Sequence, residues 1–235
     1  MKVSALFKII MREFRRELFG AVLLLALVDF LYANFTGISL AGERGTILWQ
    51  GGNEVYLAGF STVLVKLLNV SIIFITIGKI ADKLSGDLMV YLLARAADYR
   101  KFIRAYTAAA ALLGEMLLAL SHLLYYCFAG FYPEQAASAF SYLSMDCLGF
   151  PGMLILYFIL NYCCFLENGF LYIIGIYLLN TVLPVPILPA MSTVKFFTLR
   201  SRIPLSSLVL LLLGTDLIAA VCYDVLIKRR SVNLC

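Results

Sequence analysis

The sequence predicts an all-α membrane protein, and three observations support this fold class. Hydrophobic residues make up 63% of the 235 residues and charged residues only 14%, whereas soluble domains carry about 25% charged residues. The apolar residues gather in runs long enough to cross a bilayer, which takes about 20 residues. Lysines and arginines fall mainly on one side of the topology that these runs define. A water-soluble globule is excluded, because one core cannot bury this much apolar surface.

Six apolar runs are expected to cross the membrane as helices of a single domain, residues 1–235. The expected spans are 19–40, 55–80, 106–131, 148–166, 170–190 and 203–227. Only residues 167–169 separate the fourth span from the fifth, which predicts an antiparallel hairpin. The fifth span runs into Pro184, Pro186 and Pro189, which prevent a regular helix because each proline removes a backbone donor. We therefore expect a broken or re-entrant element between spans five and six.

An amphipathic helix is expected before the first span, over residues 1–18. Its apolar residues recur at helical spacing, and cations occupy many of the other positions. The apolar residues are Val3, Leu6, Phe7, Ile10, Phe14 and Leu18, and the cations are Lys2, Lys8, Arg12, Arg15 and Arg16. Such a helix is expected to lie along the inner membrane surface. The alternative, a topology signal alone, requires the charges but not the apolar stripe.

The distribution of cations predicts the orientation of the chain. With the N-terminus in the cytoplasm, fourteen lysines and arginines fall on the cytoplasmic side and four on the other side. The four are Arg44, Lys195, Arg200 and Arg202. This asymmetry places both termini in the cytoplasm. It also accounts for the net charge of +5, so we expect no nucleic-acid partner.

Five ionisable side chains are expected inside the spans. They are Asp29, Lys66, Glu115, His122 and Asp216. At 1.5 Å per helical residue, the three carboxylates and the lysine lie roughly 13–20 Å into their spans, near the middle of a core about 30 Å thick. Because isolated charges are costly there, Lys66 is expected to pair with one of the carboxylates. The set lines a translocation path or subunit seam, or it joins the helices structurally.

Several catalytic and metal-binding patterns are missing from the sequence. It contains no G-x-x-x-x-G-K-[ST] phosphate loop, no H-E-x-x-H and no G-x-S-x-G, and His122 is the only histidine. The six cysteines form no C-x-x-C pair and lack the spacing of a zinc site. They are interpreted as small hydrophobes, with a Cys127–Cys147 bridge across an outer loop as the alternative. We expect no catalytic residue, no metal and no cofactor in this chain.

The longest cytoplasmic segment, residues 79–106, contains a short apolar helix. Ser85 and Gly86 are expected to begin it, with Asp87 in its first turn. Residues 88–93 are too few to span a membrane and too apolar for an ordinary solvated loop, which favours contact with a protein partner. The alternative is a basic loop packed on the membrane face.

This order of elements resembles the permease subunits of type-2 ABC exporters. Those proteins typically have an interfacial helix, six spans, a cytoplasmic coupling helix between spans two and three, and a broken element between spans five and six. The residues that match the order of their second loop are Gly86, Leu88 to Leu93, Arg95, Ala96, Ala97, Tyr99, Arg100 and Lys101. The resemblance covers nearly the whole chain, although the proline that often follows the apolar stretch is absent.

The resemblance implies a permease subunit in the bacterial cytoplasmic membrane. The coupling residues that it implies are Leu88, Met89, Tyr91, Leu92, Leu93 and Arg95. It also implies a separate cytosolic ATPase subunit, which would bind ATP and Mg²⁺, and a second permease subunit, identical or paralogous, within the lipid bilayer. The substrate class is an amphipathic molecule, such as an antimicrobial peptide, an antibiotic or a lipid-linked molecule.

Two alternatives come from other functional classes. One is an intramembrane hydrolase that uses Glu115, His122 and an aspartate, and this alternative requires the purified chain to turn over a substrate without a partner. The other is a non-transporting membrane immunity protein that sequesters a toxin. Protection by such a protein would not depend on an ATPase.

Overall fold

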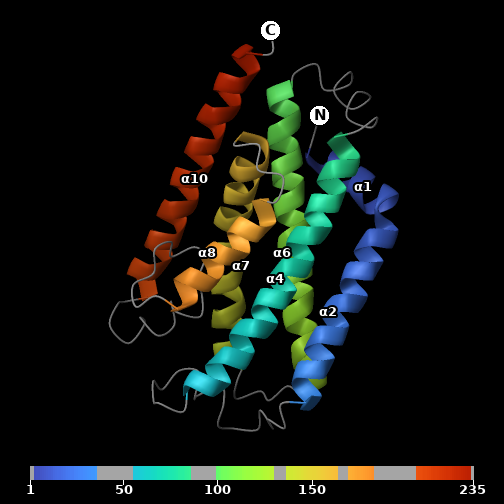
Figure 1. Cartoon of the computed structure of the whole chain (residues 1–235), viewed down its shortest axis with the longest axis vertical. Coiled ribbons are helices and arrows are strands. Elements are labelled where there is room, and N and C mark those ends of the chain that lie inside the picture. Colours follow the sequence, from blue (N-terminus) through green and yellow to red (C-terminus); the bar gives the residue numbers. More distant parts are fainter. Residues whose placement is uncertain are drawn as a thin grey trace.

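A computed structural model describes residues 3–35, 55–85, 99–129, 136–163, 169–182 and 205–233. Within these ranges the chain is helical and contains no strand, which confirms the predicted all-α class (Figure 1). The helices are α1 (Val3–Glu13), α2 (Arg15–Phe35), α4 (Val55–Ser85), α6 (Tyr99–Ala129), α7 (Ala136–Phe158), α8 (Gly169–Val182) and α10 (Leu205–Asn233). A π-helical segment, Ile159–Cys163, follows α7 directly.

Three helical stretches in the described ranges are long and apolar enough to cross a membrane. They are Arg15–Asn34, Arg100–Phe128 and Val209–Lys228, and Cys147–Asn161 forms a shorter apolar helix. Large apolar side chains are exposed on α2 and α10, including Phe19 at 65% and Leu210 at 69% exposure. Exposure of this kind is unfavourable in water and ordinary in lipid. These helices are those of a membrane protein, and the full set of six spans stays a prediction.

Helices α1 and α2 are joined by continuous backbone hydrogen bonds around a bend at Phe14. The Phe14 amide donates to the Ile10 carbonyl and the Leu18 amide donates to the Phe14 carbonyl, both at 3.0 Å. Leu6 and Ile10 are completely buried, and α1 packs against α6. The apolar stripe predicted before the first span is therefore covered by protein. Its predicted place at the membrane surface is not tested by these contacts.

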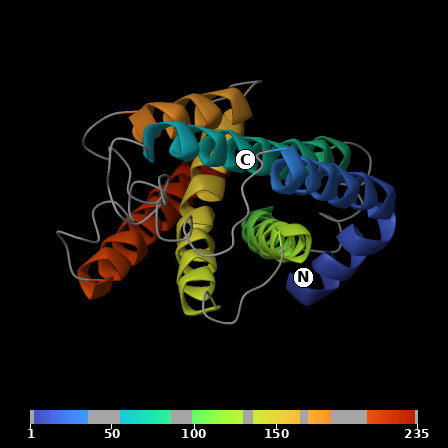
Figure 2. The ribbon, with the colours of Figure 1, turned by 90° about the horizontal axis from the view of Figure 1, so that it is seen from below.

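Helix α6 lies at the centre of the described helices. It contacts α1, α2, α4, α7 and α10, and Figure 2 shows it end-on between α2 and α7. Figure 1 shows that α4 ends and α6 begins at the end of the bundle where α1 begins and α10 finishes. The two helix ends that flank residues 86–98 therefore lie at the same end of the bundle as the start of α1 and the end of α10, and this arrangement is compatible with the predicted topology.

A side-chain cap closes the connection between α7 and α8. The Gly169 amide, at the start of α8, donates to the Asn161 Oδ1 atom at 3.0 Å. This bond satisfies one of the free amides at the helix N-terminus. A Cβ atom at Gly169 would lie 2.1 Å from the same oxygen, so the cap requires glycine.

Two predicted elements lie outside the described residues. One is the coupling helix, with Leu88, Met89, Tyr91, Leu92, Leu93 and Arg95, and the other is the broken element after Pro184. Helix α8 ends at Val182, two residues before that proline.

Close packing at Gly114 fixes the distance between α6 and two neighbours. A Cβ atom there would lie 2.3 Å from Cε1 of Phe150 on α7 and 3.2 Å from Cδ1 of Ile77 on α4. Phe150 is buried and its ring lies 5.7 Å from the ring of Phe74. A side chain at this position would therefore have to displace the Phe150 ring or separate the helices.

We predict that Gly114→Ala destabilises the protein by roughly 1–3 kcal/mol through overpacking. Gly214→Ala is the matched control, because a Cβ atom at Gly214 meets nothing within 4 Å and alanine favours the helix. The measurement is the melting temperature of each purified variant in lipid nanodiscs. Equal melting temperatures for the two variants would contradict the packing described at Gly114.

Candidate functional site

Three polar side chains from three helices meet inside the bundle. They are Asp29 of α2, Asn69 of α4 and Ser121 of α6. The Asn69 Nδ2 group donates to Asp29 Oδ1 and to Ser121 Oγ, each at 2.8 Å. The Ser121 hydroxyl donates to Asp29 Oδ2 at 3.0 Å. We call these three residues the Asp29 cluster.

The three residues of the Asp29 cluster are almost completely buried. Asp29 is 1% exposed, Ser121 4% and Asn69 6%. Polar groups at this depth need hydrogen bonds, because their transfer from water is costly. Both carboxylate oxygens of Asp29 accept such a bond. The Asn69 Oδ1 atom is buried and has no hydrogen-bond partner among the described residues.

His122 and two tyrosines surround the Asp29 cluster. His122 interacts electrostatically with Asp29, as does Tyr125. The Tyr125 ring lies 5.6 Å from the ring of Tyr32 on α2. Two of the five predicted intramembrane residues, Asp29 and His122, therefore belong to one site.

Glu115 and Asp216 form a second polar group, between α6 and α10. Asp216 of α10 interacts electrostatically with Glu115 and lies beside the backbone of Gly152 on α7. Gly152 follows Pro151, which has no amide hydrogen and interrupts the hydrogen bonds of α7. The Lys66 backbone lies in α4, and its side chain is outside the described part of the structure. Its pairing with Asp29, Glu115 or Asp216 stays a prediction.

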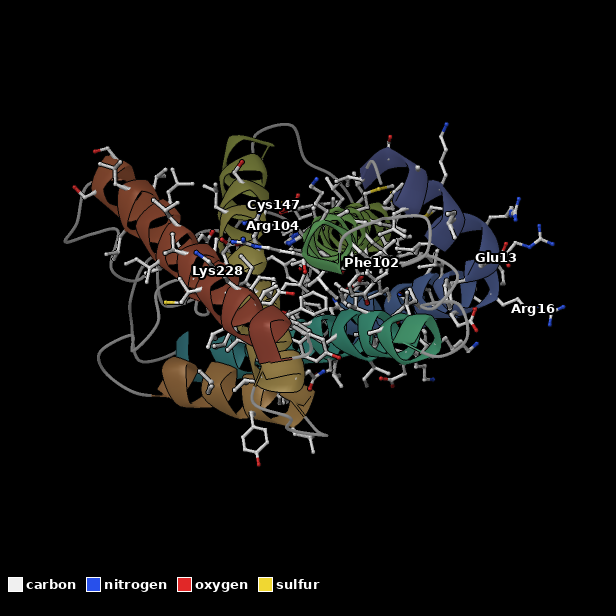
Figure 3. The ribbon with its side chains drawn as sticks, turned by 90° about the horizontal axis from the view of Figure 1, so that it is seen from above. Glu13, Arg16, Phe102, Arg104, Cys147 and Lys228 are labelled. Carbon is white, nitrogen blue, oxygen red and sulfur yellow. The ribbon has the colours of Figure 1, made fainter. Side chains whose placement is uncertain are left out.

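Ion pairs connect the helix ends on both sides of residues 86–98. Lys83, near the end of α4, pairs with Glu17 at the start of α2. Arg100 and Arg104, at the start of α6, both donate to Asp224 of α10, with Arg100 at 2.8 Å and Arg104 Nε at 2.7 Å. Figure 3 shows Arg104 between α6 and α10. Residues 86–98 are thus bounded by links to α2 and to α10.

Sequence reasoning missed Asn69, Ser121 and Asp224. Asn69 and Ser121 are uncharged, so they do not stand out in apolar runs as Asp29 does. Their signal is an amide and a hydroxyl near mid-depth in two expected spans. Asp224 lies one turn before Lys228 at the basic end of the last span. The prediction for this segment rests on its cations, which indicate orientation but not the partner of Asp224.

No disulfide joins Cys127, Cys147 and Cys222. The alternative of a Cys127–Cys147 bridge is therefore wrong for this structure. That the cysteines act as small hydrophobes stays an interpretation. Within the described ranges, no group of three or more His, Cys, Asp or Glu side chains could hold a metal ion.

No family model, curated protein or solved structure matches this sequence or its fold. The described structure defines a helical protein of the membrane type with two polar groups inside its bundle. Any narrower class is a proposal, argued below from these residues.

We predict that Asn69→Ala lowers the stability of the protein by roughly 1–3 kcal/mol, because both buried acceptors of Nδ2 lose their donor. Asn34→Ala on α2 is the matched control, because Asn34 is exposed and donates only to the Phe30 carbonyl of its own helix. Thermal unfolding in nanodiscs measures both changes. A control variant that loses as much stability as Asn69→Ala would contradict the energetic role of the cluster.

Proposed function

We propose that the chain is the transmembrane permease subunit of an ATP-driven exporter of the type-2 ABC class, in the bacterial cytoplasmic membrane. One observation carries this proposal. The end of α4 and the start of α6 lie at the same end of the bundle as the start of α1 and the end of α10, and the sequence between α4 and α6 contains Leu88 to Arg95. With this end in the cytoplasm, a coupling helix there would face a cytosolic ATPase.

The ion pairs at the helix ends support a mechanical role for this segment. The link from Lys83 to Glu17 and the links from Arg100 and Arg104 to Asp224 join its two flanks to α2 and α10. A displacement of residues 88–95 would act on both helices. These helices expose large apolar side chains, so they are suited to rearrange against lipid or a second permease subunit.

The proposed cycle assigns ATP chemistry to the partner. The chain has no phosphate loop, so ATP and Mg²⁺ would bind to a separate ATPase subunit. Closure of the ATPase dimer would move the coupling helix, and two permease subunits would open a path for an amphipathic substrate. An antimicrobial peptide, an antibiotic or a lipid-linked molecule would suit such a path through the bilayer.

The geometry gives less support to an intramembrane hydrolase. His122 lies about 10 Å along α6 from Glu115, because seven residues separate them. His122 interacts with Asp29 and Glu115 interacts with Asp216. The residues that hydrolysis would require therefore belong to two separate polar groups.

We predict that the tagged chain, solubilised from its native membrane, copurifies with a protein that contains a phosphate loop. Leu92→Asp should abolish this association, because it places a charge in the apolar coupling segment. Leu92→Met keeps the segment apolar and should retain the partner. Mass spectrometry of the eluate and its ATPase activity are the measurements. The permease proposal fails if the wild-type chain never brings down an ATPase.

We further predict that Asp224→Asn uncouples the copurified complex without dissociating it. The substitution removes the charge that links α10 to Arg100 and Arg104, while an exposed ion pair contributes little to stability. The ATPase rate of the complex in nanodiscs should change several-fold. Glu13→Gln is the matched control, since it breaks an exposed pair with Arg12 inside α1. Identical rates for both variants would contradict the mechanical role.

A further inference from the structure

The Asp29 cluster brings a buried carboxyl group together with a neutral amide and a neutral hydroxyl. Asp29 Oδ2 lies 3.0 Å from Ser121 Oγ, and Asn69 Nδ2 lies 2.8 Å from both Asp29 Oδ1 and Ser121 Oγ. The three side chains come from three different helices. They form a small polar centre that is enclosed by protein rather than by lipid.

The hydrogen bonds of Asp29 do not balance its charge. Their donors, Asn69 and Ser121, are both uncharged, and Asp29 is 1% exposed. An ionised carboxylate in an apolar interior is costly unless a cation or a proton accompanies it. The carboxylate therefore requires a counter-charge within the cluster or beside it.

Asn69 turns its Nδ2 group toward Asp29 and Ser121 and leaves its amide oxygen without a partner in the described part of the structure. Asn69 is only 6% exposed, and its Oδ1 atom has no hydrogen-bond partner among the described residues. The oxygen and nitrogen of an amide have nearly the same shape, so a half-turn of the amide exchanges their positions. That turn would direct Oδ1 toward Asp29 and Ser121 and move Nδ2 away from both acceptors. A cation bound by the three oxygen atoms would offset the two lost hydrogen bonds.

We propose that Asp29, Asn69 and Ser121 form a binding site for one Na⁺ ion. The carboxylate of Asp29, the hydroxyl oxygen of Ser121 and the turned amide oxygen of Asn69 would be its ligands. Hard cations prefer oxygen ligands of these kinds. A single carboxylate favours a monovalent ion, and the close spacing of the side chains favours a small one.

Bound Na⁺ would join α2, α4 and α6 at one point. It would neutralise Asp29 and turn the unpartnered amide oxygen into a ligand, so occupancy would stabilise the packing of the three helices. This inference does not depend on the exporter proposal, because the cluster lies inside a single chain. Two residues of the chain are alternative sources of the positive charge that would balance Asp29. They are His122, which interacts with Asp29, and Lys66, one helical turn before Asn69.

The test is Na⁺ binding by the purified full chain in phosphatidylcholine nanodiscs. Choline chloride replaces NaCl at constant ionic strength, and ²²Na⁺ retention and melting temperature are measured at about pH 6 and about pH 8, the range in which imidazoles titrate. We expect about one Na⁺ per chain at saturation and a melting temperature raised by about 5 °C. Choline should produce neither effect.

Three variants locate the bound ion. Asp29→Asn should abolish binding and make the melting temperature independent of NaCl. Ser121→Ala is a smaller change than Asp29→Asn and keeps the carboxylate of Asp29, so the variant should fold. Its affinity for Na⁺ should be about tenfold lower or more. Thr76→Val is the matched control, because Thr76 is a buried hydroxyl of α4 that donates only to the Ile72 carbonyl of its own helix. It should bind Na⁺ like the wild type.

Two results would overturn the inference. Wild-type protein without Na⁺ binding at both pH values would mean that a proton, His122 or Lys66 balances Asp29. If Lys66 is the partner of Asp29, Lys66→Met would then lower the stability of the otherwise wild-type protein. The same substitution would not lower the stability of Asp29→Asn. Equal Na⁺ binding by the wild type, Asp29→Asn and Ser121→Ala would place the ion elsewhere.

Discussion

The hydrogen-bonded contact of Asp29 with Asn69 and Ser121 constrains the arrangement of the other helices. A carboxylate within an apolar helix must face hydrogen-bond donors on neighbouring helices, because lipid offers it none. Donors on α4 and α6 satisfy both of its oxygens. Each of the three helices therefore has one rotation about its axis that brings its polar residue to the common point. The remaining apolar side chains pack around a geometry that this contact defines.

Helix α6 connects the two polar groups of the bundle. Ser121 faces α2 and α4 through its hydrogen bonds, whereas Glu115 interacts with Asp216 of α10. The two residues lie about 9 Å apart along the helix, and Gly114, directly before Glu115, packs closely against Phe150 of α7 and Ile77 of α4. A rigid central helix of this kind makes the two groups sensitive to the same movement, because neither can shift without α6.

The sequence predicts the helices well because apolar runs and cation asymmetry are properties of single segments. It also predicts Asp29, since a carboxylate in such a run is conspicuous. Asn69 and Ser121 could not be identified in the same way, because uncharged polar residues are common in apolar helices and their importance depends on which helices meet. The periodicity of α1 predicted its apolar stripe but not the burial of that stripe against α6, which depends on contacts between residues distant in the chain.

The burial of α1 has a consequence for biosynthesis. Helix α1 is made well before α6, against which it packs and which begins only at Tyr99. Chains emerge from the ribosome N-terminus first, so Leu6 and Ile10 leave it long before their final neighbours exist. The membrane surface offers these side chains a temporary apolar cover. The position expected from the sequence and the position in the folded bundle can thus be successive states of one helix during assembly.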